Sequence, residues 1–171
     1  KGISNGYPMA AIIGIRDVME SAQDSFISST YWTERIGPTA ALATIRKMTS
    51  QNVPEHLLHV GNSIRSILRE EAERHGLKIK IEGVPPLSIF SFEYGEAAPI
   101  LHTLFTQEML NKGFLASRAF YAAYAHEERH INAYLEAVRD VFDTISKALE
   151  TEKAAELLKG PVAHRGFNRL A

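Results

Sequence analysis

Lys78-Ile79-Lys80-Ile81-Glu82 and Leu87-Ser88-Ile89-Phe90-Ser91-Phe92-Glu93-Tyr94 decide the fold, and Pro85-Pro86 lies between them. The first stretch alternates charged and apolar residues, which is typical of an edge strand. The second carries more large apolar side chains and indicates a more central strand. Because a diproline favours a turn, the two stretches are expected to pair as antiparallel strands.

Two helices are predicted before this strand pair. Residues 39–48 are rich in alanine and contain no helix breaker. Residues 54–75 repeat apolar positions at helical spacing, with Pro54 suited to the first turn and Gly76 placed where a helix ends. The two helices are expected to lead into a separate small domain.

The region after the strands continues the same pattern. Pro99 opens a helix that is closed by Asn111-Lys112-Gly113, Phe114-Leu115 is expected to add a short strand, and the longest helix is predicted from Glu127 to Leu149. Residues 39–171 are therefore predicted to form a small α+β domain, with helices on one face of an antiparallel sheet.

The N-terminal segment has a different character. Met9–Ile15 predicts a short buried strand, residues 16–22 predict one or two helical turns, and Phe26–Thr30 indicates a second strand. Two short strands and a turn of helix bury too little surface to form a core. Residues 1–38 are therefore expected to be the remnant of a larger α/β domain.

Composition excludes several classes of protein. The 171 residues are 45% hydrophobic and carry a net charge of −1, so a globular fold is expected and nucleic acid is not an expected partner. No cysteine is present, which excludes disulfides and thiolate metal sites and fits a cytoplasmic location. Pro8–Ile15 is too short to cross a bilayer. We expect a soluble protein that does not bind membranes.

A lysine-containing loop opens the chain and carries a family resemblance. Lys1 is followed by Gly6, by Pro8 and then by Met9-Ala10-Ala11. This pattern resembles the Schiff-base lysine segment of class III aminotransferases that use pyridoxal 5'-phosphate, a group that includes glutamate-1-semialdehyde aminomutase. The resemblance extends over the whole chain. It implies the C-terminal part of a fold-type I transferase, beginning at the lysine that carries the cofactor.

The resemblance also implies further site residues. In the family, a threonine donated across a homodimer interface binds the cofactor phosphate, and Thr30 with Ser29 matches it, while Thr33 is the alternative. The implied reaction is amino-group transfer between a small-molecule amino donor and a carbonyl acceptor, or within one molecule as in the aminomutase. Because the family's residues over the cofactor ring precede the lysine, the isolated chain is expected to be inactive.

The chemistry explains why a lysine is needed in this position. A lysine amine forms an imine with the cofactor aldehyde and, once displaced by the substrate amine, can move a proton between substrate and cofactor. For both roles Lys1 must be partly neutral near pH 7, which requires burial or a nearby positive charge. Lys1 is thus the predicted catalytic residue, as well as the cofactor anchor.

His126-Glu127-Glu128-Arg129-His130 spells the HExxH motif of zinc peptidases, which is a competing interpretation. Glu150 is the available third ligand, but one uninterrupted helix would separate it from His130 by roughly 30 Å. We therefore expect no metal site and interpret the motif as an acidic first helical turn. A noncatalytic helical interaction module over residues 39–171 is a third possibility. The other histidines are expected at the surface or at helix ends: His56, His59, His75, His102 and His164.

Overall fold

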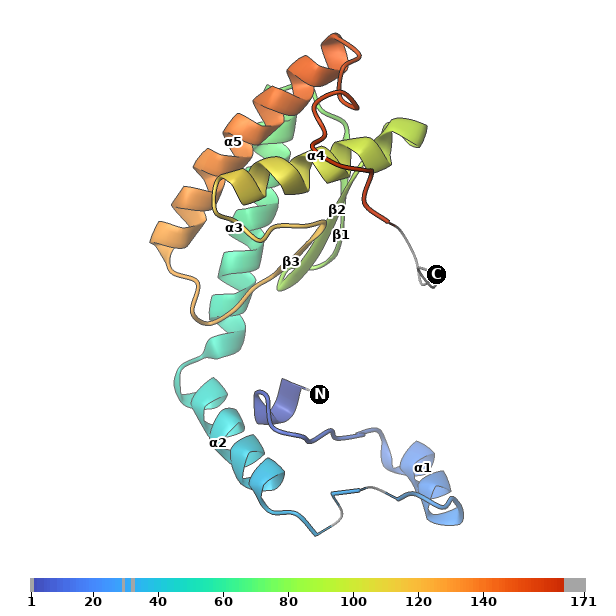
Figure 1. The fold of residues 1–171 in the computed structure, drawn as a ribbon. Helices are drawn as coiled ribbons and strands as arrows, with labels where there is room; N and C mark the ends of the chain where they lie inside the picture. Colours follow the sequence, from blue (N-terminus) through green and yellow to red (C-terminus); the bar gives the residue numbers. More distant parts are fainter. Residues whose placement is uncertain (1, 29, 32, 165–171) are drawn as a thin grey trace. The chain divides into compact units, whose positions relative to one another are not determined.

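The computed structural model describes residues 2–28, 30–31 and 33–164, which divide into two compact units (Figure 1). The N-terminal unit ends at Pro54 and the C-terminal unit begins at Glu55. In chain order the elements are the 3₁₀ helix Gly2–Ser4, α1 (Arg16–Met19), the 3₁₀ helix Glu20–Asp24, α2 (Ile36–Ser50), α3 (Val53–Arg74), β1 (Ile79–Val84), β2 (Leu87–Phe92), the 3₁₀ helix Gly95–Ala97, α4 (Ala98–Asn111), β3 (Ala119–Tyr121) and α5 (Glu128–Glu150).

The C-terminal unit is built on a three-stranded antiparallel sheet with β2 in the centre. Ile79 of β1 lies opposite Phe92, and Leu87 lies opposite Tyr121 of β3. β1 is thus an edge strand and β2 the central strand, as predicted. The α+β fold class expected for this region is confirmed.

The core lies between this sheet and the helices α3, α4 and α5. Phe90 and Phe92 of β2 point into it, with ring centroids 4.9 Å from Phe105 of α4 and 6.0 Å from Phe142 of α5, respectively. Burying a side chain of this size stabilises the fold by about 1.5–3 kcal/mol. The apolar stripes predicted for the helices therefore face one continuous core.

A glycine allows α3 to approach the turn between β1 and β2. A Cβ atom on Gly61 would lie 2.0 Å from the carbonyl oxygen of Pro85, a distance that no side chain can occupy. Further along α3, the Arg65 guanidinium donates a hydrogen bond of 3.2 Å to the carbonyl of Gly83. The strand turn is thus held directly against the helix backbone.

A buried carboxylate links α3 to α5. Glu71 is 1% exposed and accepts hydrogen bonds from the guanidinium groups of Arg74 at 2.9 Å and Arg139 at 3.2 Å. A buried charge is costly unless it is paired in this way. Glu71 therefore holds the two helices in one alignment.

Two expectations for the C-terminal unit were wrong. The third strand is Ala119–Tyr121 and not Phe114-Leu115, because strand formation here depends on pairing with β2, while Phe114 packs on Tyr134 and Leu115 is 96% exposed. His102 is a core residue, 7% exposed, and its Nε2 accepts the Phe92 N–H at 3.3 Å. The periodicity of α4 already placed this position next to buried leucines.

Two predicted strands of the N-terminal unit are absent from the described residues. Residues 9–15 are extended without strand pairing, Ile12 and Ile13 are 80% and 91% exposed, and residues 26–28 are likewise unpaired. A strand needs a hydrogen-bonded neighbour, and no described segment supplies one. The helical turns predicted for residues 16–22 are confirmed by α1 and the 3₁₀ helix that follows it.

The units divide after α2, at Pro54, whereas the sequence places a domain boundary at residue 38. The reason is that α2 packs against the loop that follows Lys1. Whether residues 1–38 are the remnant of a larger domain stays a prediction. In the described parts of both units, no helix combines the length and the apolar character that crossing a membrane requires.

Candidate functional site

Of the predicted cofactor residues, Thr30 lies within the described chain, and Lys1 and Ser29 lie outside the described residues. Thr30 is an exposed residue in a turn that precedes α2. Its side chain is therefore accessible to an anion from outside the unit. The alternative threonine, Thr33, is exposed as well.

The loop that follows Lys1 folds back on itself. The Ser4 hydroxyl donates a hydrogen bond to the carbonyl of Tyr7, and Ser4 is 1% exposed. Asn5 and Gly6 both have positive φ angles, 48° and 106°, which reverse the chain direction. The segment next to the predicted catalytic lysine is thus a tight, internally bonded turn.

This loop packs against the first turn of α2. A Cβ atom on Gly37 would lie 2.9 Å from the carbonyl oxygen of Pro8 and 3.2 Å from the Cβ of Met9. Only glycine allows this approach without displacing the loop. The chain therefore brings the segment after Lys1 together with the helix that follows Thr30.

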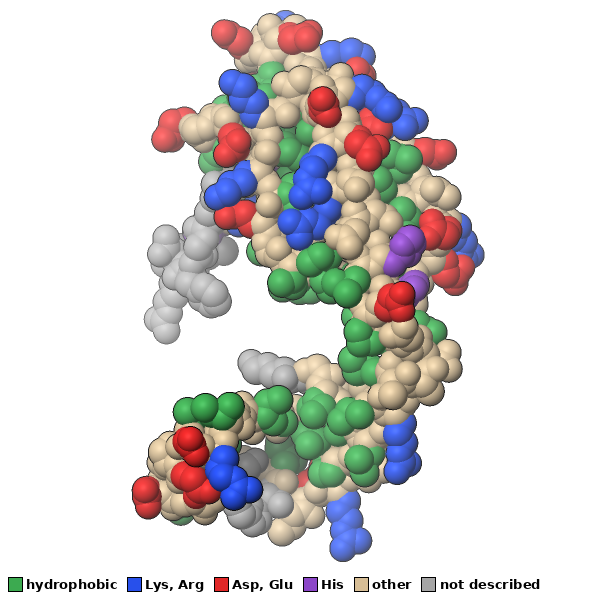
Figure 2. Space-filling view, turned by 180° about the vertical axis from the view of Figure 1, so that it is seen from behind, with side chains coloured by type: hydrophobic (Ala, Val, Ile, Leu, Met, Phe, Trp, Pro, Cys, Tyr) green, Lys and Arg blue, Asp and Glu red, His purple; other side chains and the backbone are tan. Residues whose placement is uncertain are grey.

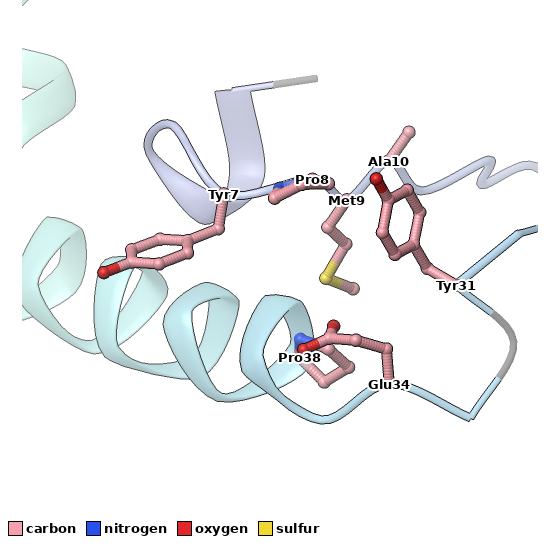
Figure 3. A pocket seen from close by; sticks show the side chains of 7 residues that line it. All are labelled: Tyr7, Pro8, Met9, Ala10, Tyr31, Glu34 and Pro38. Carbon is pink, nitrogen blue, oxygen red and sulfur yellow. The ribbon is translucent and has the colours of Figure 1, made fainter.

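A pocket of about 550 Å³ lies between the loop and the start of α2 (Figure 3). The Met9 side chain reaches across it toward Pro38 and Glu34, with Tyr7 on one side and Tyr31 on the other. Its lining residues are Tyr7, Pro8, Met9, Ala10, Tyr31, Glu34 and Pro38. With one carboxylate in an otherwise uncharged lining, this pocket suits uncharged groups rather than anions.

Glu34 caps α2 from within this pocket. Its carboxylate accepts the Gly37 N–H at 2.9 Å and also the N–H of Ile36. A negative charge is favourable at the positive end of a helix. Because Glu34 occupies the N-terminus of α2, a phosphate is not expected there. Sequence reasoning missed this cap, although an acidic residue just before Gly37-Pro38 is a signal for it.

The HEERH segment forms the start of α5. The helix begins at Glu128, so His126 precedes it and Glu127 is its N-cap. His126 Nδ1 accepts the Ala123 N–H at 3.0 Å, and His130 Nδ1 accepts the Glu127 N–H at 3.0 Å. The Glu127 side chain in turn accepts the His130 N–H, which completes a capping box.

These contacts give both histidines of the motif a structural role, since each accepts a backbone hydrogen bond. Their ring centroids are 6.4 Å apart, and one ring nitrogen of each is used by the backbone. Within the described ranges, no group of three or more His, Asp or Glu residues is arranged to hold a metal ion. As predicted, His130 and Glu150 lie on one uninterrupted helix.

Sequence comparison relates the chain to several aminotransferases. It is 31% identical over 83 residues to an aminopentol aminotransferase of Sphingopyxis macrogoltabida, covering 48% of this chain and 20% of that protein. It is 24% identical over 154 residues to a 3-aminobutyryl-CoA aminotransferase of Cloacimonas acidaminovorans, covering 87% and 37%. It is 28% identical over 159 residues to a glutamate-1-semialdehyde 2,1-aminomutase of Methanothermobacter thermautotrophicus, covering 82% and 37%.

The fold is also similar to that of a protein with a solved structure. The structure of the pyridoxal-phosphate internal aldimine form of the FumI protein of Sphingopyxis sp. MTA144 superposes with a TM-score of 0.74 and 22% identity, over 87% of this chain and 36% of that one. No family model matches the chain. It spans at most 38% of the length of the curated relatives it matches. By sequence and fold, the chain is thus similar to the C-terminal part of class III pyridoxal-phosphate-dependent aminotransferases and glutamate-1-semialdehyde aminomutases.

Proposed function

We propose that the chain is the C-terminal portion of a pyridoxal-phosphate-dependent aminotransferase, acting on a small-molecule amino donor and a carbonyl acceptor. The observation that carries this proposal is the structural match over 87% of the chain to a protein solved with pyridoxal phosphate. The named relatives, which are aminotransferases and aminomutases, support the same reaction class.

The described residues around the predicted site fit the cofactor. Cβ atoms built on Gly2 and Gly6 meet nothing within 4 Å, so the loop after Lys1 leaves open space beside its backbone. Thr30 is exposed and offers a hydroxyl to a phosphate. Glu34 lies at the start of α2 and disfavours a phosphate at that point, which supports the Thr30 turn as the proposed anion position.

When bound, pyridoxal phosphate supplies the electron sink for transamination. Lys1 holds the cofactor through its amine and then moves the proton at the substrate carbon. For this the amine must be deprotonated, which burial at a completed site would favour. Thr30 and Ser29 would hold the phosphate by hydroxyl hydrogen bonds and so keep the reacting atoms in a fixed position.

Exposed apolar surface supports a larger assembly. Hydrophobic side chains gather on the face of the N-terminal unit in Figure 2, and Ile13 and Phe26 are 91% and 96% exposed. We infer that residues 1–38 belong to a large α/β domain whose other parts cover this surface. The complete protein is further proposed to be a cytoplasmic homodimer. In this dimer, Thr30 of one subunit contributes to the active site of the other subunit.

The test uses the protein translated from the complete reading frame that encodes this chain. Lys1→Ala is expected to abolish the visible absorbance of lysine-bound cofactor and all amino transfer. Thr30→Ala is expected to weaken cofactor retention by about tenfold, the loss of one strong phosphate hydrogen bond. Thr33→Ala is the matched control and should retain the cofactor. Equal loss in both threonine variants would contradict the assignment of Thr30.

The intramolecular reaction is the second candidate, because three glutamate-1-semialdehyde aminomutases are among the relatives. The two reactions separate in one assay with the complete protein. A transaminase needs an added carbonyl acceptor for turnover, whereas an aminomutase converts a single amino-aldehyde substrate without one. The isolated 171-residue chain is expected to be inactive in both assays, and turnover by it would contradict the proposal.

A further inference from the structure

An aromatic pocket in the C-terminal unit lies outside the site proposed above. It is a solvent-open depression of about 280 Å³ between the segment after α4 and the N-terminal part of α5. Its lining residues are Phe114, Leu115, Ala116, Ser117, Ala119, Phe120, Tyr121, His126 and Tyr134. An apolar cavity of roughly 150 Å³ is sufficient for benzene, so this pocket has room for a substituted single ring.

The walls of the aromatic pocket are edges and faces of rings. Phe114 and Phe120 both have centroids 5.8 Å from the ring of Tyr134, with interplanar angles of 79° and 58°. Such tilted arrangements present the positive edge of one ring beside the negative face of another. A further aromatic ring can extend this array in the same manner.

Tyr134 supplies a polar group at a buried point of the pocket. It is 7% exposed, and burial raises the pKa of its hydroxyl, so the group keeps its proton. Its ring packs on Phe114 and Phe120 within the core, and its hydroxyl is not among the fully buried polar atoms that lack a partner in the described residues. A tyrosine hydroxyl in a pocket lining can donate a hydrogen bond to a polar atom of a ligand or accept one from it.

His126 supplies a second polar group with a defined proton. Its Nδ1 accepts the Ala123 N–H, so in the neutral ring the hydrogen is on Nε2, which is a donor. Burial first, and then the neighbouring His130 and His56, lower the pKa of His126 and keep the ring neutral at pH 7. None of the described lining residues is Lys, Arg, Asp or Glu. The aromatic pocket therefore offers hydrogen bonds but no charge.

We propose that the aromatic pocket is a binding site for a neutral, single-ring aromatic compound that carries a hydroxyl or another uncharged hydrogen-bonding group. The ring packs against Phe114 and Phe120, and the polar atom pairs with the hydroxyl of Tyr134. A carboxylate is excluded because its desolvation is not offset by a cation in the lining.

Three fluorinated probes test this proposal on the full chain: para-fluorophenol, fluorobenzene and para-fluorobenzoate. Fluorine NMR measures their affinities, and backbone amide shifts at residues 114–126 and 134 locate the binding. Para-fluorophenol is expected to bind about 2- to 10-fold tighter than fluorobenzene, the value of one net hydrogen bond. Para-fluorobenzoate is expected to bind at least tenfold more weakly than the phenol.

Tyr134→Phe removes the hydroxyl and keeps the ring. It is expected to abolish the preference for para-fluorophenol over fluorobenzene and to leave fluorobenzene affinity within a factor of two. The matched control is Tyr94→Phe, which loses a hydroxyl that accepts the Lys78 N–H outside the aromatic pocket. Absence of phenol binding at millimolar concentration, equal binding of the benzoate, or an unchanged preference in Tyr134→Phe overturns the proposal.

Discussion

The N-terminal and C-terminal units differ in what they do with their apolar residues. The C-terminal unit buries twenty hydrophobic residues in one core, whereas Ala41 and Val53 are the buried hydrophobic residues of the described N-terminal unit. Among large hydrophobic residues, twelve of the described N-terminal positions up to Pro54 are exposed, against eight in the longer C-terminal unit. The C-terminal unit thus has a hydrophobic core of its own, whereas the described N-terminal unit leaves most of its large apolar side chains exposed.

The strongest test of this difference compares two phenylalanines. Phe142→Ala, in the centre of the core, is expected to lower the free energy of unfolding of the chain by about 3–5 kcal/mol. Phe26→Ala, at a side chain that is 96% exposed, is expected to change it by less than about 0.5 kcal/mol. Urea unfolding followed by circular dichroism measures both. Similar losses in the two variants would remove the distinction between the units.

Ile13, which is exposed in this chain, tests the proposal that other parts of a larger protein cover the N-terminal unit. Ile13→Ser should leave the unfolding free energy of the chain unchanged within about 0.5 kcal/mol. In the protein from the complete reading frame it is expected to cost about 1.5–3 kcal/mol, because the side chain would then be buried. Equal effects in the two proteins would show that Ile13 stays exposed.

The close packing of the C-terminal unit predicts a penalty for a single methyl group. Gly61→Ala places a Cβ atom against the Pro85 carbonyl and is expected to cost about 1–3 kcal/mol, again measured by urea unfolding. Gly160→Ala is the matched control, since a Cβ atom on Gly160 would meet nothing within 4 Å. A tolerated Gly61→Ala would mean that α3 and the strand turn are not held together as described.

The start of α5 predicts a smaller, pH-dependent effect. Burial, with the nearby His130 and His56, lowers the pKa of His126 in the folded chain. As the pH falls, His126 is therefore protonated at a higher pH in the unfolded chain than in the folded chain. Stability contributed by the neutral ring is therefore present above about pH 6.5 and is lost below it. His126→Asn keeps an acceptor for the Ala123 N–H but does not titrate. It should lose less stability than the unchanged chain between pH 7.5 and 5.5, and an equal loss would contradict this role.

Local signals made most of the C-terminal unit predictable. The helices α3 and α5 have clear apolar stripes, and the alternation in β1 with the diproline after it marks a strand pair. β3 was missed because a three-residue strand is defined by pairing with β2, a nonlocal contact. The strand expected at Met9–Ile15 failed for the same reason, since an apolar run forms a strand only beside a neighbour.

The candidate site was predictable only in part. Lys1 and Thr30 come from the family resemblance and stay predictions, whereas the pocket with Tyr7 and Glu34 arises from the packing of a loop on α2, which no local pattern encodes. The histidine cap at α5 did have a signal, because Glu127 and His130 have capping-box spacing. This signal was not recognised because the same residues also match the HExxH motif of zinc peptidases.

Locating the covalently bound cofactor tests the role of Lys1 most directly. The protein from the complete reading frame is reduced with borohydride, digested and analysed by mass spectrometry. The phosphopyridoxyl group is expected on Lys1 and is expected to be lost in Lys1→Ala. A cofactor attached to another lysine, or no covalent label in a protein that transfers amino groups, would contradict this role of Lys1.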